Sequence, residues 1–269
     1  MSASVCVLGS SSRGNATAIT FDNSGRFILV DAGLTPRRVR AALVEAGASA
    51  HFHTLRAIFL THLDRDHWSL SWAKQLQRAP VPVILRRAHA AQAIEMGVPP
   101  ACLRPIDGPF RLGETAEVRP IAVPHDTIGS TAFRFDCDHA HIGHATDLGH
   151  VTDELLEAFA GLDMLSIESN YDEALQRRSP RPAFLKDRIM GGRGHLSNEQ
   201  SVEAARLLTA GGTIRHLVLL HLSQECNRPE IVRDLFCERL PAMAASLVIT
   251  RPMQPTALLQ VRRREAAVA

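Results

Sequence analysis

The sequence predicts an α/β fold of stacked layers, and two observations lead to this prediction. Short apolar runs of strand length, such as 55–60 and 164–168, are interspersed with segments of helical spacing, such as 229–240. The chain has 269 residues, 45% of them hydrophobic, and no linker divides it. We therefore expect one domain over residues 1–261, followed by a flexible tail at 262–269.

The first part of the chain predicts a strand hairpin followed by a helix. Strands are expected over residues 4–8, 16–21 and 26–31. Residues 22–25 are Asp, Asn, Ser and Gly, which tolerate the dihedral angles of a tight turn. Thr35 followed by Pro36 predicts the start of a helix, and Gly47 predicts its end. The loop 9–15 exposes N–H groups and hydroxyls that could hold an anion, although an ordinary small-residue turn is the alternative.

The rest of the chain continues the alternation of strands and helices. Further strands are expected over residues 55–60, 81–85, 118–123, 131–135, 140–145, 164–168 and 216–220, with one or two more in 247–261. Helices are expected over residues 68–76, 87–96, 198–209 and 229–240. Polar side chains directly follow several of these strands, and strand ends are where open α/β sheets place their sites.

Four potential metal ligands follow the apolar run 55–60 within six positions. They are His62, Asp64, Asp66 and His67. Imidazole nitrogens and carboxylate oxygens both bind zinc and related divalent ions, and imidazole is the softer ligand. One His and one Asp would indicate a solvated polar turn, but four such groups at one strand end indicate a metal site.

This stretch resembles the HxHxDH motif of the metallo-β-lactamase-fold hydrolases, with Asp64 at the position of the second histidine. The later landmarks of that family also occur in order, each after a predicted strand: His125, Asp147 and His221. Together with the segments 9–15, 30–33, 168–170 and 194–198, they make the chain most similar to the YycJ/WalJ-like subfamily, which is related to the tRNase Z-like branch. The resemblance covers roughly residues 4–240.

The resemblance implies the metallo-β-lactamase fold, a four-layer αβ/βα sandwich, with two divalent metal ions. These ions would be Zn²⁺ or Mn²⁺, with iron as a further option. One ion would be bound by His62, Asp64 and His125. The other would be bound by Asp66, His67 and His221, and Asp147 would bridge the two.

The segments around Glu168 and His195 are similar to the Glu and His motifs that the tRNase Z-like branch places beside the scissile phosphate. By this resemblance His195 would protonate the leaving oxygen, Glu168 would orient His195, and Asp66 would orient the attacking hydroxide. The alternative for His195 is a structural residue at the entry to helix 198–209. Substrate contacts are expected from Ser11, Ser12, Asn15, Asn170 and Ser197.

The expected activity is that of a metal-dependent phosphodiesterase, in particular a nuclease that acts on DNA or RNA through a hydroxide shared by two metal ions. A small phosphodiester is the alternative substrate. The same metal chemistry suits thioesters, lactones and lactams, so hydrolysis of a carboxyl derivative is a second hypothesis. A catalytically impaired member that binds a nucleotide or a protein is a third, prompted by Asp64 in place of histidine.

The distribution of charged residues indicates a possible partner for one segment, but the net charge indicates none for the whole chain. The net charge of +2 does not indicate a polyanion partner for the chain as a whole. Residues 176–194, however, carry six basic side chains against Asp187 alone. This segment is either a solvated surface or a contact for a phosphate backbone.

The remaining expectations concern thiols, location and the other histidines. The five cysteines lack a CxxC pair, so we expect buried free thiols. No apolar stretch approaches the ~18 to 20 residues of a membrane span, and the N-terminus shows no secretion signal, so we expect a cytoplasmic protein without a membrane partner. The oligomeric state is left open. Surface or supporting roles are expected for His139, His141, His144 and His150.

Overall fold

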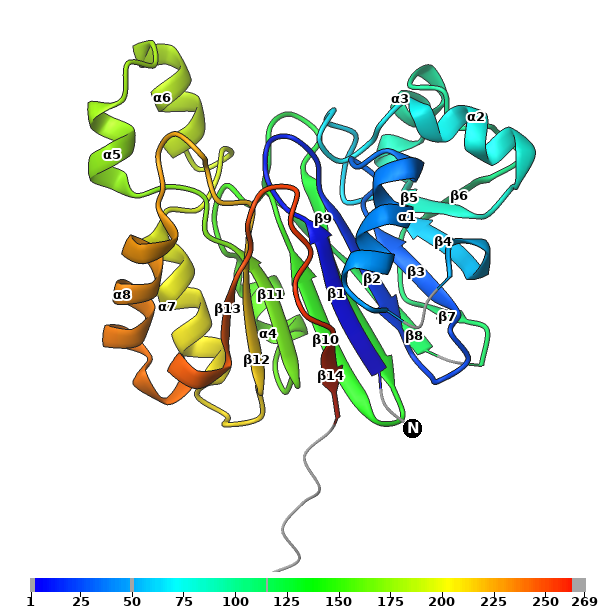
Figure 1. Cartoon of the computed structure of the whole chain (residues 1–269). Helices are drawn as coiled ribbons and strands as arrows, with labels where there is room; N and C mark the ends of the chain where they lie inside the picture. The colour runs from blue at the N-terminus through cyan, green and yellow to red at the C-terminus, as the bar shows by residue number, and fades with distance from the viewer. Residues whose placement is uncertain (1–2, 49–50, 115, 263–269) are drawn as a thin grey trace, which may run out of the picture.

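The computed structural model describes residues 3–48, 51–114 and 116–262, which form two seven-stranded sheets packed face to face (Figure 1). Helices lie on the outer face of each sheet, so the layers follow the order helix, sheet, sheet, helix. This arrangement is the four-layer αβ/βα sandwich that the sequence predicted.

The first sheet has the strand order β14-β1-β2-β3-β4-β5-β6, in which β3 to β6 run parallel. Its strands are β1 (Ala3–Gly9), β2 (Ala16–Thr20), β3 (Phe27–Val30), β4 (Leu55–Phe59), β5 (Val83–Arg86), β6 (Leu103–Ile106) and β14 (Leu259–Val261). The outer face is covered by α1 (Pro36–Glu45), α2 (Ser71–Arg78) and α3 (Ala90–Glu95). Short 3-10 helices precede β4 and α3, at Phe52–Thr54 and Arg87–His89.

The second sheet has the order β13-β12-β11-β10-β9-β8-β7, in which β10 to β13 run parallel. Its strands are β7 (Phe110–Leu112), β8 (Ala116–Val123), β9 (Ser130–Cys137), β10 (Ala140–Ala145), β11 (Met164–Glu168), β12 (His216–Leu220) and β13 (Leu247–Ile249). The outer face is covered by α4 (Asp153–Ala158), α7 (Asn198–Thr209) and α8 (Pro229–Arg239), and a 3-10 helix at Pro241–Ser246 leads into β13. Helices α5 (Glu173–Arg178) and α6 (Ala183–Met190) stand apart, beyond the ends of the strands (Figure 1).

Side chains alternate along the strands between the core shared by the sheets and the cores under the helices. In β4, Phe59 faces the other sheet whereas Ile58 faces the helices. Phe59 packs edge-on against Phe133 and Phe135 of β9, with ring centroids 5.4 and 5.3 Å apart. This packing holds the two sheets together. At one edge of the sandwich, the carboxyl end of β4 in the first sheet lies close to the carboxyl ends of β10 to β12 in the second.

Most predicted elements are confirmed, but the helix expected over 68–76 begins later, at Ser71. The reason is that the Trp68 N–H donates to the Asp64 carbonyl oxygen, and Trp68 forms a bridge with Ala32, so this part of the chain is a turn. Five elements were not predicted: β6, β7, α4, α5 and α6. All five are short, and the segment that holds α5 and α6 is dominated by charge rather than by helical spacing of apolar residues.

The expectations on membranes and thiols can be compared with the structure. No helix within the described residues has the length and apolar character needed to span a bilayer. All five cysteines are free thiols, and four of them are buried, as predicted. Burial raises the pKa of Cys6 to about 11. The division into one domain and a tail stays a prediction, and residues 263–269 of that tail lie outside the described residues.

Candidate metal centre

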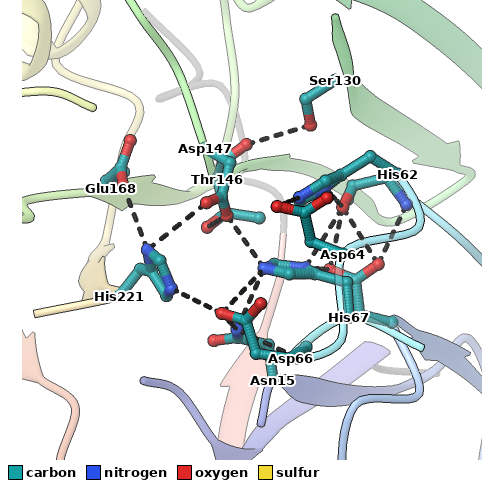
Figure 2. Close-up of polar contacts among 12 residues, drawn as sticks. Asn15, His62, Asp64, Asp66, His67, Ser130, Thr146, Asp147, Glu168 and His221 are labelled. Atoms are coloured by element: carbon teal, nitrogen blue, oxygen red, sulfur yellow. Dashed lines mark hydrogen bonds and ion pairs between the residues drawn. The ribbon is translucent and has the colours of Figure 1, made fainter. Parts of the chain in front are cut away.

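The predicted ligands follow the ends of four strands and lie close together at one edge of the sandwich. Figure 2 labels all of them except His125. The loop after β4 carries the first four ligands, and β8, β10 and β12 lead to His125, Asp147 and His221. Asp147 and His221 have positive φ angles of 56° and 55°. Such strained backbone turns the chain sharply at the strand end and persists only where its surroundings hold it.

One group of ligands consists of His62, Asp64 and His125, whose ligand atoms all lie within 4.8 Å of one another. His62 Nε2 lies 3.9 Å from Asp64 Oδ2. His62 Nε2 is also buried without a hydrogen-bond partner among the described residues. A buried polar atom without a partner is costly, and a metal ion would satisfy it. This nitrogen therefore fits the role of a metal ligand.

A second group consists of Asp66, His67 and His221, again within 4.8 Å. Asp66 Oδ2 lies 3.1 Å from His221 Nε2 and 3.6 Å from His67 Nε2. Asp147 lies between the groups, because its Oδ2 is 3.0 Å from His67 Nε2 and its Oδ1 is 4.0 Å from His125 Nε2. The structure thus places all seven predicted ligands close to one another.

Three of the ligand histidines are oriented through the nitrogen that faces away from the centre. His67 Nδ1 donates to Asp31 Oδ2 at 2.7 Å, and His125 Nδ1 donates to the Gly194 carbonyl at 2.9 Å. His62 Nδ1 lies 3.0 Å from the Thr61 hydroxyl. Such contacts fix the ring and its tautomer and leave Nε2 for a metal, as is usual for ligand histidines.

The protonation of the cluster also suits divalent ions. Burial and the neighbouring His67 hold the pKa of His62 well below its usual value, so His62 is neutral and able to bind a metal. Burial alone would lower the pKa of His67 and His221, but Asp147 and the other carboxylates raise both pKa values well above the usual one. In the metal-free protein His67 and His221 are therefore protonated, and their positive charges take the place of the charge that a metal ion would supply.

Glu168 and His195 form a hydrogen-bonded pair beside the ligands. His195 Nδ1 donates to Glu168 Oε1 at 2.7 Å, and the fully buried carboxylate also accepts from the Leu148 N–H at 2.8 Å. Burial opposes ionisation of Glu168, but His195 lowers its pKa overall. Burial likewise lowers the pKa of His195, but the Glu168 carboxylate raises it overall. The pair therefore favours a protonated His195. Glu168 Oε1 also lies 3.2 Å from His221 Nδ1.

A cleft of about 420 Å³ opens onto His195 and onto two of the predicted ligands, Asp64 and His125. Its wall includes Arg181 and Arg188 from the basic segment 176–194. Arg188 forms a bidentate pair with Asp126, and Arg181 Nε lies 3.0 Å from Glu225 Oε2. The opposite charges hold both guanidinium groups at the cleft. The basic segment therefore contributes to the lining of the site, although Arg177, Arg181 and Arg188 are already paired with carboxylates.

The five predicted substrate contacts lie in different places. Ser12 and Asn170 line the cleft. Ser11 is buried, and its hydroxyl accepts from the Arg13 N–H. Asn15 Nδ2 lies 3.0 Å from His67 Nε2 and 3.4 Å from Asp66 Oδ2, so it contacts predicted ligands. The Ser197 hydroxyl accepts from the Gln200 N–H in the capping box that starts α7.

Sequence reasoning missed several groups that hold the site in place. Asp31 and Thr61 support the ligand histidines, and Asp126 ties the loop after His125 to α6. Asp31 and Asp126 both follow strands, but their partners lie far away in sequence. Among the described residues, none of the groups that could hold a metal includes the remaining predicted supporting histidines: His139, His141, His144 and His150.

The fold and this cluster together define a metal-dependent hydrolase of the metallo-β-lactamase fold. Residues 26–222 match the family described as the beta-lactamase superfamily domain. The chain belongs to that superfamily. The resemblance to the YycJ/WalJ-like subfamily is confirmed as well by the curated proteins to which the chain is similar.

Two curated relatives are similar over most of their length. Exodeoxyribonuclease WalJ of Streptococcus pneumoniae is 30% identical over 243 residues, which cover 87% of each chain. Exodeoxyribonuclease YycJ of Bacillus anthracis is 28% identical over 233 residues, which cover 84% of this chain and 85% of the relative. Both relatives are therefore comparable with this chain as a whole.

Solved structures of more distant proteins share the fold. A diphosphatase of the PhnP family has a TM-score of 0.64 at 19% identity, covering 97% of this chain and 99% of its own. Zn²⁺-bound PqqB of Methylobacterium extorquens has a TM-score of 0.65 at 16% identity, covering 94% and 99%. The short form of human tRNase Z has a TM-score of 0.60 at 17% identity, covering 94% and 98%.

Proposed function

We propose that the protein is a metal-dependent phosphodiesterase that acts as a nuclease, with DNA as the first substrate to test. The observation that carries this proposal is the hydrogen-bonded pair of Glu168 and His195 beside two groups of potential metal ligands. Both curated relatives are named exodeoxyribonucleases, which supports DNA as substrate and attack at a strand end.

The seven predicted ligands would hold the two divalent ions. Ions bound there would polarise the phosphate and activate a water molecule, as such ions do in other two-metal hydrolases. The protein's own contribution is rigidity. Asp31, Thr61 and the Gly194 carbonyl fix three of the imidazole rings, so the ligands need little reorganisation when metal binds.

His195 would donate a proton to the leaving oxygen. Its Nδ1 is engaged by Glu168, which leaves Nε2 as the nitrogen for a substrate in the cleft. Glu168 holds the imidazole in place and favours its protonated form. Glu168 is therefore a positioning residue, whereas His195 touches the reacting group.

The Glu168–His195 pair and the guanidinium groups favour a phosphodiester over a carboxyl derivative. A nucleoside alkoxide is a poor leaving group, so a positioned acid accelerates its departure by roughly 10² to 10⁴-fold. A thiolate leaves without such help. Arg181 and Arg188 also bring guanidinium groups to the cleft, each paired with a carboxylate, and a second phosphate of a polynucleotide would compete with Glu225 and Asp126 for them.

A substrate panel tests the proposal directly. The purified chain, loaded with metal, is assayed on labelled single-stranded DNA, RNA, bis-p-nitrophenyl phosphate and an acyl thioester. We expect hydrolysis of nucleic acid and of bis-p-nitrophenyl phosphate, with a preference for DNA over RNA. Turnover of the thioester with neither nucleic acid would contradict the proposal, and binding of DNA without turnover of any substrate would indicate an impaired member.

We expect higher activity with Mn²⁺ than with Zn²⁺. Asp64 replaces a neutral imidazole with a carboxylate, and this harder oxygen ligand shifts the preference towards manganese. The metal-free protein is reconstituted with each ion, and its rates on one DNA substrate are compared. Asp64→His restores the imidazole, so it should move the preference back towards zinc. Equal or higher activity of the zinc-loaded protein would contradict this expectation.

Metal uptake should release protons and should weaken as the pH falls. Because carboxylates raise the pKa of His67 and His221 well above the usual value, both hold protons at pH 7 and must lose them to bind metal. We expect release of about two protons. Calorimetric titration in buffers of different ionisation enthalpy measures this number, and heats that do not depend on the buffer would refute the expectation.

The finer predictions on location, metal and assembly are part of the same proposal. A cytoplasmic nuclease would meet nucleic acid directly. The preferred ion, the direction of attack along the strand and the oligomeric state are questions for the assays above and for a mass measurement in solution.

A further inference from the structure

Phe184 on α6 is a large aromatic side chain that is 73% exposed. It is the one aromatic residue among the exposed large hydrophobic side chains of the described chain. Its neighbour Leu185 turns inward and lines the cleft, as does Ile189 one turn later. Phe184 itself is not among the residues that line the cleft, but it lies beside Leu185 on α6, which does.

Arg188 connects Phe184 with the centre of the site. Residues 184 and 188 are four positions apart on α6, so their side chains lie on the same face of the helix. The Arg188 side chain is 62% exposed, and it reaches Asp126, the residue next to His125. An exposed ring thus lies one helical turn from a guanidinium group that lines the cleft.

Helices α5 and α6, with the turn between them, are attached to the rest of the protein. Under α5 and α6, Tyr171, Ile189 and Cys226 form a small core of their own. The Asp172 N–H donates to the Cys226 carbonyl at 2.8 Å, and Arg181 pairs with Glu225. The segment that carries Phe184 is thereby attached to the rest of the protein, which favours a stacking surface.

We propose that Phe184, together with Arg181 and Arg188, forms a subsite that stacks one unpaired nucleobase of the substrate next to the cleaved phosphate. This inference rests on the proposed nuclease function and adds the substrate class, a single-stranded end. An aromatic face stacks on any base, and guanidinium groups bind the adjoining phosphates, so this combination is typical of single-strand binding without sequence preference.

Tryptophan fluorescence tests the stacking directly. The native residues Trp68 and Trp72 are buried, at 1% and 0% exposure, so Phe184→Trp adds an exposed fluorophore on α6. A single-stranded oligonucleotide should quench it saturably, whereas an abasic strand with the same phosphates should not. Val44→Trp, at a 78% exposed position on α1, is the matched control and should not be quenched.

Equal quenching by the abasic strand would overturn the subsite. So would an unquenched Phe184→Trp under conditions in which fluorescence anisotropy shows that the labelled strand is bound. This measurement does not depend on turnover, so it separates the subsite from the nuclease activity. A protein that binds and stacks a strand but hydrolyses none would refute the proposed function alone.

Kinetics provide the second measurement. Phe184→Ala should lower kcat/KM for a single-stranded oligonucleotide about tenfold more than for bis-p-nitrophenyl phosphate, which has no base to stack. Val44→Ala should change neither value. Equal effects on the two substrates would overturn the subsite. Conversion of a dimer into a monomer by Phe184→Ala, measured by light scattering, would also overturn it and would assign the ring to a second copy of the chain.

Discussion

Asp66→Ala should abolish hydrolysis of every substrate, whatever its leaving group. Asp66 Oδ2 lies 3.1 Å from His221 Nε2 and 3.6 Å from His67 Nε2, so its removal takes one ligand from a group of three. It also takes a negative charge away from two cationic imidazoles. Burial opposes ionisation of Asp66, but His67 and His221 lower its pKa to about 2, so the charge is present at any pH used for an assay.

The measurement combines metal analysis with rates on a natural DNA strand and on bis-p-nitrophenyl phosphate. Metal content should fall, and both rates should drop below detection. Glu203→Ala removes a carboxylate that pairs with Arg206 on the solvent face of α7, and it should leave both quantities unchanged. A folded Asp66→Ala protein that keeps its full metal content or hydrolyses either substrate would show that Asp66 is not a required ligand.

The strands that build the site were predictable because their sequence signals are local. The segments 164–168 and 216–220 are short apolar runs followed by polar residues, and the structure has β11 and β12 at the same bounds. Parallel strands bring their carboxyl ends to one edge, so ligands scattered over 160 positions meet there. The strand ends therefore explain why the ligands meet, whereas the choice of His125, Asp147 and His221 came from the resemblance to the metallo-β-lactamase-fold hydrolases.

The supporting contacts could not be predicted, because they depend on packing between distant segments. Asp31 and His67 are 36 positions apart, and Arg188 and Asp126 are 62 apart. Nothing in the sequence near either partner indicates the pairing. Helices α5 and α6 were missed for a related reason. Their apolar residues pack against Tyr171 and Cys226 rather than against the main cores, so the apolar spacing within each helix is weak.

The roles of Asn15 and Ser197 also depend on contacts that the local sequence does not reveal. Both are small polar residues near predicted strand or helix ends, and both were expected to contact substrate. In the structure Asn15 contacts Asp66 and His67, and Ser197 caps α7. Hydroxyl and amide groups satisfy backbone and ligand partners as readily as substrates, so residue type alone does not separate these roles. Only the position relative to the cleft does.

His195→Ala should leave metal binding intact and should slow hydrolysis according to the leaving group. His195 belongs to neither predicted group of three ligands. A ligand atom of His195 does lie within 4.8 Å of those of Asp147, Glu168 and His221, but its Nδ1 is 2.7 Å from Glu168 Oε1 and is engaged by that carboxylate. A natural strand releases an alkoxide that needs a proton, so its turnover should fall roughly 10²-fold or more. The p-nitrophenolate of bis-p-nitrophenyl phosphate needs little protonation, so its turnover should fall much less.

The deciding quantity is the ratio of the two rates, natural strand to p-nitrophenyl diester, for wild type and His195→Ala under saturating metal. His150→Ala is the matched control, since His150 is exposed and its Nδ1 donates to the Gly192 carbonyl oxygen at 2.8 Å. That variant should keep the wild-type ratio. If His195→Ala slows both substrates equally while metal content is unchanged, His195 is not the proton donor. The Glu168–His195 pair would then serve to hold the segment after α6 against the ligands.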